Sequence, residues 1–96
     1  MVNRTAINPN QLRAARAWLG WTRGKLCLKS GVSERAIAQF ELGRSVPHDD
    51  TLVRLRSTCE REGIRFQFIG AVATGIGIEI GEDRIAGFEA LLRWQH

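Results

Sequence analysis

Residues 22–43, TRGKLCLKSGVSERAIAQFELG, read as two short helices joined by a tight turn. Gly31 stands at the reversal of the chain, where a residue without a Cβ atom adopts a positive φ at little steric cost. Thr22 and Ser33 stand where the two helices should begin, and their hydroxyls can accept hydrogen bonds from otherwise unpaired amides of the first turn. The stretch therefore predicts two capped helices on either side of Gly31.

Apolar residues in this stretch are spaced so that the two helices can pack at a steep angle. They are Leu26, Val32, Ile37 and Phe40, and the small Cys27 permits a close approach. The pattern predicts a helix-turn-helix, whose second helix stands out from the domain and can enter a DNA major groove. A helical hairpin with a purely structural role is the alternative interpretation, because short helix-glycine-helix stretches are common in all-α proteins.

The wider stretch GWTRGKLCLKSGVSERAIAQFELGRSVP, residues 20–47, resembles the Cro/lambda-repressor-like (XRE-type) helix-turn-helix regulators. The residues that carry the resemblance are Arg23, Leu26-Cys27, Gly31-Val32-Ser33, Ile37, Glu41-Leu42-Gly43 and Pro47. Where this chain has Arg23, family members have Gln, and the arginine can contact phosphate at least as well. Where this chain has Cys27, family members have Ala, which is a mild change. The resemblance covers about residues 9–69 and implies a mostly α fold with a four-helix lambda-repressor-like DNA-binding domain.

Two further helices complete the predicted four. Asn8-Pro9 starts the first, because proline at the first helical position lacks only an amide that would be unpaired anyway. The last should have Asp49 or Asp50 as its cap and run to about Glu62. We assign this DNA-binding domain to residues 1–63.

Beyond residue 63 the helical spacing changes to alternation, which indicates strands. We expect a small β-hairpin that turns between residues 70 and 74, followed by a short C-terminal amphipathic helix capped by Asp83. Residues 64–96 would then form an appendage for dimerisation or for binding a partner. The apolar residues assigned to that interface are Phe66, Phe68, Ile76, Ile78, Ile80, Ile85, Phe88, Leu91 and Leu92.

Composition limits the class of protein. The 96 residues are enough for one domain with at most a small appendage. No apolar run approaches the roughly 20 residues that cross a bilayer, and no charged-then-apolar leader is recognisable, so we expect a cytoplasmic protein. Cys27 and Cys59 are expected to be buried free thiols, since two cysteines with distant histidines do not make a zinc site. We expect neither a metal nor a cofactor.

Positive charge is concentrated in the first half of the chain. Acidic residues outnumber basic ones in residues 64–96, whereas residues 1–43 contain only Glu34 and Glu41 as acids. The basic residues of that first segment are Arg4, Arg13, Arg16, Arg23, Lys25, Lys29 and Arg35. This is the expected footprint of a phosphate-binding face, although a solvated surface has the same composition.

The resemblance implies which residues of the helix at 33–41 face DNA bases. They are Glu34, Arg35, Ala38 and Gln39. Arg35 can donate to guanine O6 and N7, and Gln39 can pair with adenine N6 and N7. Glu34 can accept from cytosine N4, or it can act only by repelling wrong sequences. The alternative for each is a solvated side chain on an exposed helix.

Contacts to DNA phosphates are expected at the two ends of the helix-turn-helix. Arg23 lies beside the free amides and the positive dipole end of its helix. Such contacts fix register rather than read sequence. The expected set is Arg23, Lys25, Ser33, Arg44 and Ser45.

The resemblance also implies a structural ion pair between Arg16 and Glu41. This pair would hold the helix at 33–41, the recognition helix, against the first helix. Two unrelated surface charges are the alternative. If the pair is partly buried, loss of one partner costs ~3–5 kcal/mol, whereas an exposed pair contributes ~1 kcal/mol or less.

Little in the chain supports an enzyme, because His48 and His96 lack a spaced Ser, Cys or carboxylate partner of a known catalytic type. We therefore expect a sequence-specific transcriptional regulator, a repressor, that binds double-stranded DNA as a homodimer. An antitoxin-like or adaptor protein, whose C-terminal segment binds a different protein, is the alternative that the sequence leaves open.

Overall fold

The computed structural model describes residues 6–79 of the chain. Four helices come first, and they are α1 (Pro9–Leu19), α2 (Arg23–Ser30), α3 (Glu34–Glu41) and α4 (Asp49–Glu60). An antiparallel hairpin of β1 (Ile64–Ile69) and β2 (Val72–Ile78) follows them. The predicted order of four helices and a hairpin is confirmed, whereas the predicted C-terminal helix lies outside the described residues.

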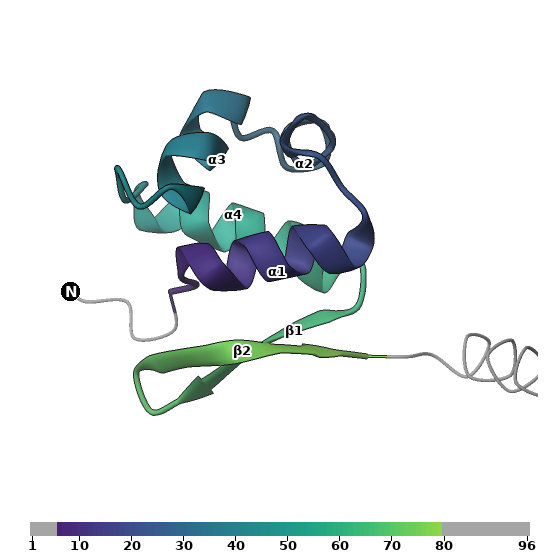
Figure 1. The fold of residues 1–96 in the computed structure, drawn as a ribbon, viewed down its shortest axis with the longest axis vertical. Coiled ribbons are helices and arrows are strands. Elements are labelled where there is room, and N and C mark those ends of the chain that lie inside the picture. Colours follow the sequence, from purple (N-terminus) through teal and green to yellow (C-terminus); the bar gives the residue numbers. More distant parts are fainter. Residues whose placement is uncertain (1–5, 80–96) are drawn as a thin grey trace, which may run out of the picture.

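The helices and the hairpin occupy opposite sides of α1. Figure 1 shows α2 and α3 on one side of this helix and the two strands on the other, with α4 behind it. The hairpin therefore lies away from the helix-turn-helix. This arrangement leaves α3 at the far end of the domain from the strands.

The first helix begins at Asn8-Pro9, as the sequence predicts. Asn8 Oδ1 accepts from the Gln11 amide at 2.8 Å, and the Gln11 side chain accepts from the Asn8 amide at 3.1 Å. This reciprocal pair is a capping box, with Pro9 at the first helical position. Gly20 ends the helix in the left-handed region at φ 68°.

The start of α4 differs from the prediction. Its cap position is His48, whose side chain makes no capping hydrogen bond, so neither Asp49 nor Asp50 is the cap. Both aspartates lie instead in the first turn, where the positive end of the helix dipole favours carboxylates. The helix also ends at Glu60, two residues earlier than expected.

The hairpin has a tighter turn than predicted. Only Gly70 and Ala71 separate the strands, and β2 begins at Val72. Gly70 has φ 60°, which suits the first central position of a two-residue hairpin turn. An irregularity in the register between Gln67 and Phe68 shifts the pairing by one residue.

One apolar core joins the four helices to β1. It contains residues from every helix together with Ile64 and Phe66 of β1. Its fully covered members include Leu12, Leu26, Ile37, Leu55 and Cys59. The apolar core therefore extends from the four helices into β1.

The hairpin residues assigned to a dimer or partner interface pack against the core of their own chain. Phe66 is only 7% exposed, and Phe68, Ile76 and Ile78 are half-buried against the same core. The alternation correctly indicated one apolar face, but α1 and α4 of the same chain cover it. The other assigned residues, Ile80, Ile85, Phe88, Leu91 and Leu92, lie outside the described residues.

Gln11 attaches the hairpin to α1. The side chain is 2% exposed, and its Nε2 donates to the Gln67 carbonyl at 2.9 Å and to the Gly75 carbonyl at 2.8 Å. Gln67 and Gly75 are paired across the strands, beside the irregularity in the register. One buried amide thus satisfies a carbonyl from each strand.

Within residues 6–79, no helix is both long and apolar enough to span a bilayer.

Candidate nucleic-acid interface

The turn between α2 and α3 has the geometry that its residues predict. Gly31 has φ 75°, and its amide donates to the Cys27 carbonyl at 2.9 Å. The buried Ser30 hydroxyl donates to the Leu26 carbonyl and accepts from the Val32 amide at 3.1 Å. These bonds satisfy the backbone where the chain reverses and hold the two helices in a fixed relation.

Both helices carry the predicted hydroxyl caps. Thr22 Oγ1 accepts from the Lys25 amide at 3.0 Å, and Ser33 Oγ accepts from the Ala36 amide at 3.1 Å. Each hydroxyl satisfies one of the first-turn amides that have no partner within the helix. The start of each helix is therefore fixed by a local hydrogen bond.

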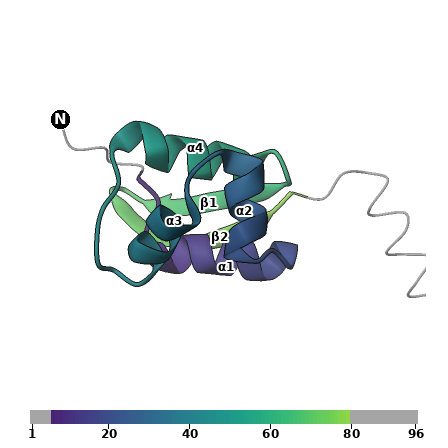
Figure 2. The same cartoon turned by 90° about the horizontal axis from the view of Figure 1, so that it is seen from above.

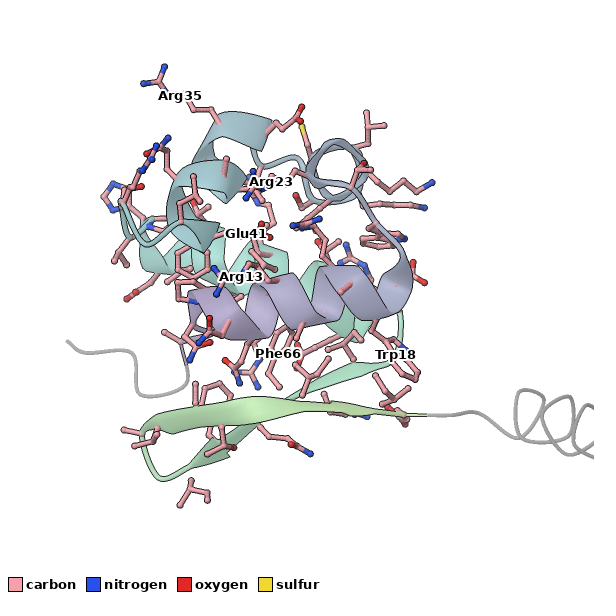
Figure 3. All side chains as sticks on the ribbon, in the orientation of Figure 1. Arg13, Trp18, Arg23, Arg35, Glu41 and Phe66 are labelled. Atoms are coloured by element: carbon pink, nitrogen blue, oxygen red, sulfur yellow. The ribbon has the colours of Figure 1, made fainter. Side chains whose placement is uncertain are left out.

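α3 is anchored by one face and exposed on the other. Ile37 and Phe40 are 0% and 2% exposed, whereas Glu34 and Arg35 are exposed. Figure 3 shows Arg35 at the outer end of α3, pointing away from the domain. In Figure 2, viewed from above, α2 and α3 lie in front of the hairpin. The described part of the chain thus presents the start of α3 to solvent.

The residues expected to contact bases share this helix but differ in exposure. Ala38 and Gln39 are half-buried, unlike Glu34 and Arg35. The Gln39 carbonyl accepts from the amides of Arg44 and Ser45 at 2.8 and 3.3 Å. The loop after α3 therefore folds back on the end of the helix.

Most of the expected phosphate-contacting residues are exposed side chains at the starts of α2 and α3 or in the loop after α3. Lys25 lies in the first turn of α2, and Ser33 caps α3. Arg44 and Ser45 lie in the loop held against α3. Arg23 differs from these residues, because its Nε donates to Glu41 Oε1 at 2.9 Å.

Glu41 lies at the centre of a cluster between α1, α2 and α3. The carboxylate is 0% exposed, and Arg16 meets it through two hydrogen bonds of 2.8 Å, from Nε to Oε2 and from Nη2 to Oε1. Arg16 Nη1 also donates to the Trp21 carbonyl at 3.0 Å. The structure therefore contains the ion pair that the sequence suggested, together with Arg23 as a second partner.

The two arginines keep this buried carboxylate ionised. Burial alone disfavours the charge, but hydrogen bonds from Arg16 and Arg23 outweigh it and lower the pKa of Glu41 below its usual value. The hydrogen bond to Glu41 correspondingly raises the pKa of Arg16, against the opposing effect of burial. The cluster is thus an ionised link between the recognition helix and the two helices before it.

Arg13 adds a further contact from α1 to the end of α3. Its guanidinium donates to the Glu41 carbonyl through Nη1 and to Asn10 Oδ1 through Nη2. Figure 3 shows Arg13 on α1 beneath α3. A cation here also opposes the negative end of the α3 dipole.

The sequence reasoning missed three of these contacts, namely those of Gln11, Arg13 and Arg23. The replacement of the family's Gln by an arginine at position 23 was the available signal, since a longer cationic side chain can reach an acid on a neighbouring helix. Gln11 was also visible as a polar residue on the apolar face of a helix, beside Leu12 and Ala15.

The cysteines fit a structural role. Cys27 is half-buried and Cys59 buried, and both are free thiols. Burial, with a smaller effect of nearby glutamates, raises the pKa of the Cys59 thiol to about 12. Among residues 6–79, no group of three His, Cys, Asp or Glu side chains is placed to hold a metal ion.

Comparison with known families agrees with this geometry. Residues 12–62, which include all four helices except the start of α1, match the family model HTH_3, helix-turn-helix. No curated protein shows a detectable match to this chain. The family match covers more than half of the chain and includes the capped turn and the Glu41 cluster. The chain belongs to the XRE/lambda-repressor-like helix-turn-helix family of DNA-binding regulators.

Proposed function

We propose that this protein is a sequence-specific repressor that binds double-stranded DNA as a homodimer. The observation that carries the proposal is the contrast between the two ends of α3. Glu41 at its end is fully buried between two arginines, whereas Arg35 at its start is exposed and points outward. A recognition helix must be held rigidly by one part and remain open along another.

Base reading is assigned to the exposed start of α3. Arg35 donates to guanine O6 and N7, a bidentate contact worth about 1–3 kcal/mol of discrimination against other bases. Glu34 accepts from cytosine N4, and Gln39 pairs with adenine from the half-buried part of the helix. Ala38 is small enough to permit close approach of the groove.

Phosphate binding is assigned to both sides of the recognition helix. The side chains of Lys25, Ser33, Arg44 and Ser45 are exposed there. Arg23 is also about one-third exposed, so its guanidinium can approach a phosphate while Nε stays bonded to Glu41. These contacts supply affinity for any sequence and make binding sensitive to salt.

The homodimer is proposed to form through the hairpin side of the domain and the segment after it. Ile69 and Val72 pair across the strands at the turn and are 75% and 65% exposed. Two recognition helices about 34 Å apart would read half-sites about 10 base pairs apart. Light scattering tests this directly, because a monomeric mass at micromolar concentration would contradict the dimer.

Selection of bound duplexes from a random pool tests the function as a whole. We expect enrichment of a two-fold symmetric sequence, bound far more tightly than random DNA. The logarithm of the association constant for this sequence should fall by roughly 0.9 per neutralised phosphate for each tenfold rise in salt concentration. Recovery of no enriched sequence would contradict sequence-specific binding.

Repression is then tested by placing the enriched site within a promoter and measuring transcription with and without the protein.

A further inference from the structure

Glu34, the first residue of α3, holds its carboxylate against the start of α2. A Cβ atom at Gly24 would lie 3.8 Å from Glu34 Oε2, 4.0 Å from Glu34 Oε1 and 3.7 Å from Thr22 Oγ1. The carboxylate therefore reaches from one helix to the first turn of the other, into the corner where Thr22 caps α2. Gly24 has no side chain to fill this space.

The same turn of α2 is where the proposed function expects a DNA phosphate. The first amides of a helix have no partner within it, and the dipole is positive there, so an anion is favoured. Glu34 brings an anion of the protein's own to this turn. A carboxylate and a phosphate side by side repel each other, and the repulsion weakens any complex in which both remain there.

Glu34 is also able to leave this position. The residue is exposed, and no ion pair within residues 6–79 holds its carboxylate. It differs in this respect from Glu41, whose carboxylate is bonded to two arginines. A rotation about its own side-chain bonds is enough to turn the Glu34 carboxylate from α2 towards a groove facing α3.

We infer that Glu34 is a specificity-determining residue whose carboxylate competes with a DNA phosphate at the start of α2. The inference rests on the proposed function and deepens it. The carboxylate gives way when a base edge in the groove donates a hydrogen bond to it, as cytosine N4 does. On other sequences it stays beside the phosphate and weakens binding. Glu34 thus rejects wrong sequences as well as reading the right one.

Two charge-removing variants test the inference. Glu34→Gln removes the negative charge and keeps an oxygen that can accept from cytosine. Glu62→Gln makes the same change in net charge in the turn between α4 and β1, outside the helix-turn-helix. For each variant and the wild type, dissociation constants are measured by fluorescence anisotropy on a random-sequence duplex and on the duplex that the wild type selects.

We expect Glu34→Gln to bind the random duplex about fivefold more tightly, the factor for one unit-charge repulsion at about 4 Å in water. The selected duplex should gain less, so that the preference between the two duplexes falls. Glu62→Gln should change both affinities by less than about twofold, because its charge lies outside the helix-turn-helix and is screened.

Two outcomes would overturn the inference while leaving the proposed function intact. Equal gains for Glu34→Gln and Glu62→Gln would mean that only net charge matters. Weaker binding of Glu34→Gln to both duplexes would mean that the carboxylate is an ordinary contact or a structural group. Failure of the proposed function is distinguishable, because the wild type would then select no sequence at all, and the inference would fall with it.

Discussion

Arg16 and Glu41 join α1 to the end of α3 through two hydrogen bonds of 2.8 Å. The carboxylate is fully buried, whereas the arginine side chain is 20% exposed. The pair is the principal polar link between the recognition helix and the rest of the domain, and Arg23 and Arg13 add to it from α2 and α1. The orientation of α3 therefore depends on these charges as well as on apolar packing.

Removal of one partner should destabilise the domain strongly. Arg16→Ala leaves a buried carboxylate with Arg23 as its remaining cation, and we expect a loss of about 3 kcal/mol in the free energy of unfolding. Urea denaturation measures the loss. A double-mutant cycle of Arg16→Ala with Glu41→Ala should give a coupling energy of at least about 1 kcal/mol. Additive losses would mean that the two charges do not cooperate.

An exposed pair on the hairpin provides the matched control. Arg65 and Glu79 form an ion pair in which both side chains are more than half exposed. Arg65→Ala should lower the free energy of unfolding by about 1 kcal/mol or less. A loss as large as that of Arg16→Ala would show that burial is not what distinguishes the two pairs.

Acid should weaken the domain through Glu41. Its pKa is lower in the folded protein than in the unfolded chain, so the unfolded state binds more protons as the pH falls. The stabilisation is fully present above the unfolded pKa of about 4.3 and is lost as the pH falls through the folded value. Unfolding free energies measured from pH 7 to pH 3 should decrease in this window. Glu41→Gln should flatten the decrease, and an unchanged pH dependence in this variant would contradict the assignment.

The hairpin should loosen when Gln11 is removed. Gln11→Ala leaves the Gln67 and Gly75 carbonyls without their donor in a part-buried site, at a cost of about 1–3 kcal/mol for each unsatisfied group. Hydrogen exchange should then be faster in β1 and β2 than in α2 and α3. Gln67→Ala is the control, because it keeps the backbone carbonyl that Gln11 contacts. Equal effects of the two variants would exclude Gln11 as the anchor.

The helix boundaries could be predicted because their signals are local. Thr22, Gly31 and Ser33 act on amides and dihedral angles within a few residues of themselves, and the structure shows each in its expected place. His48 is the exception, since the sequence suggested that an aspartate would be the cap. Aspartates are equally favourable in the first turn, one and two residues after the cap, so residue type alone did not fix the start of α4.

Contacts between distant segments were harder to predict. The alternation around Phe66 indicated an apolar face but not that α1 and α4 would cover it. The two bonds of Gln11 join residues 56 and 64 positions apart in the chain, and no local pattern encodes such a pairing. The Arg16–Glu41 pair came from the family register, whereas the contact from Arg23 depends on a residue in which this chain departs from the family.

Phosphate contacts should be separable from base contacts by their dependence on salt. Lys25→Ala and Arg44→Ala should each reduce the slope of log K against log salt by about 1, with sequence preference unchanged. Arg65→Ala, on the hairpin, should leave the slope as it is. A slope that is unaffected by Lys25→Ala and Arg44→Ala would place the phosphate contacts elsewhere.

Selection from a random duplex pool with the wild type, Arg35→Ala and Arg23→Ala tests the account most directly. We predict that Arg35→Ala loses preference at one base position in each half-site, by about 1–3 kcal/mol, because the proposed function assigns the reading of guanine to this exposed arginine. Arg23→Ala should weaken binding to all sequences to a similar extent and keep the enriched motif. If Arg35→Ala enriches the same motif with the same preference as the wild type, the outward face of α3 does not read DNA.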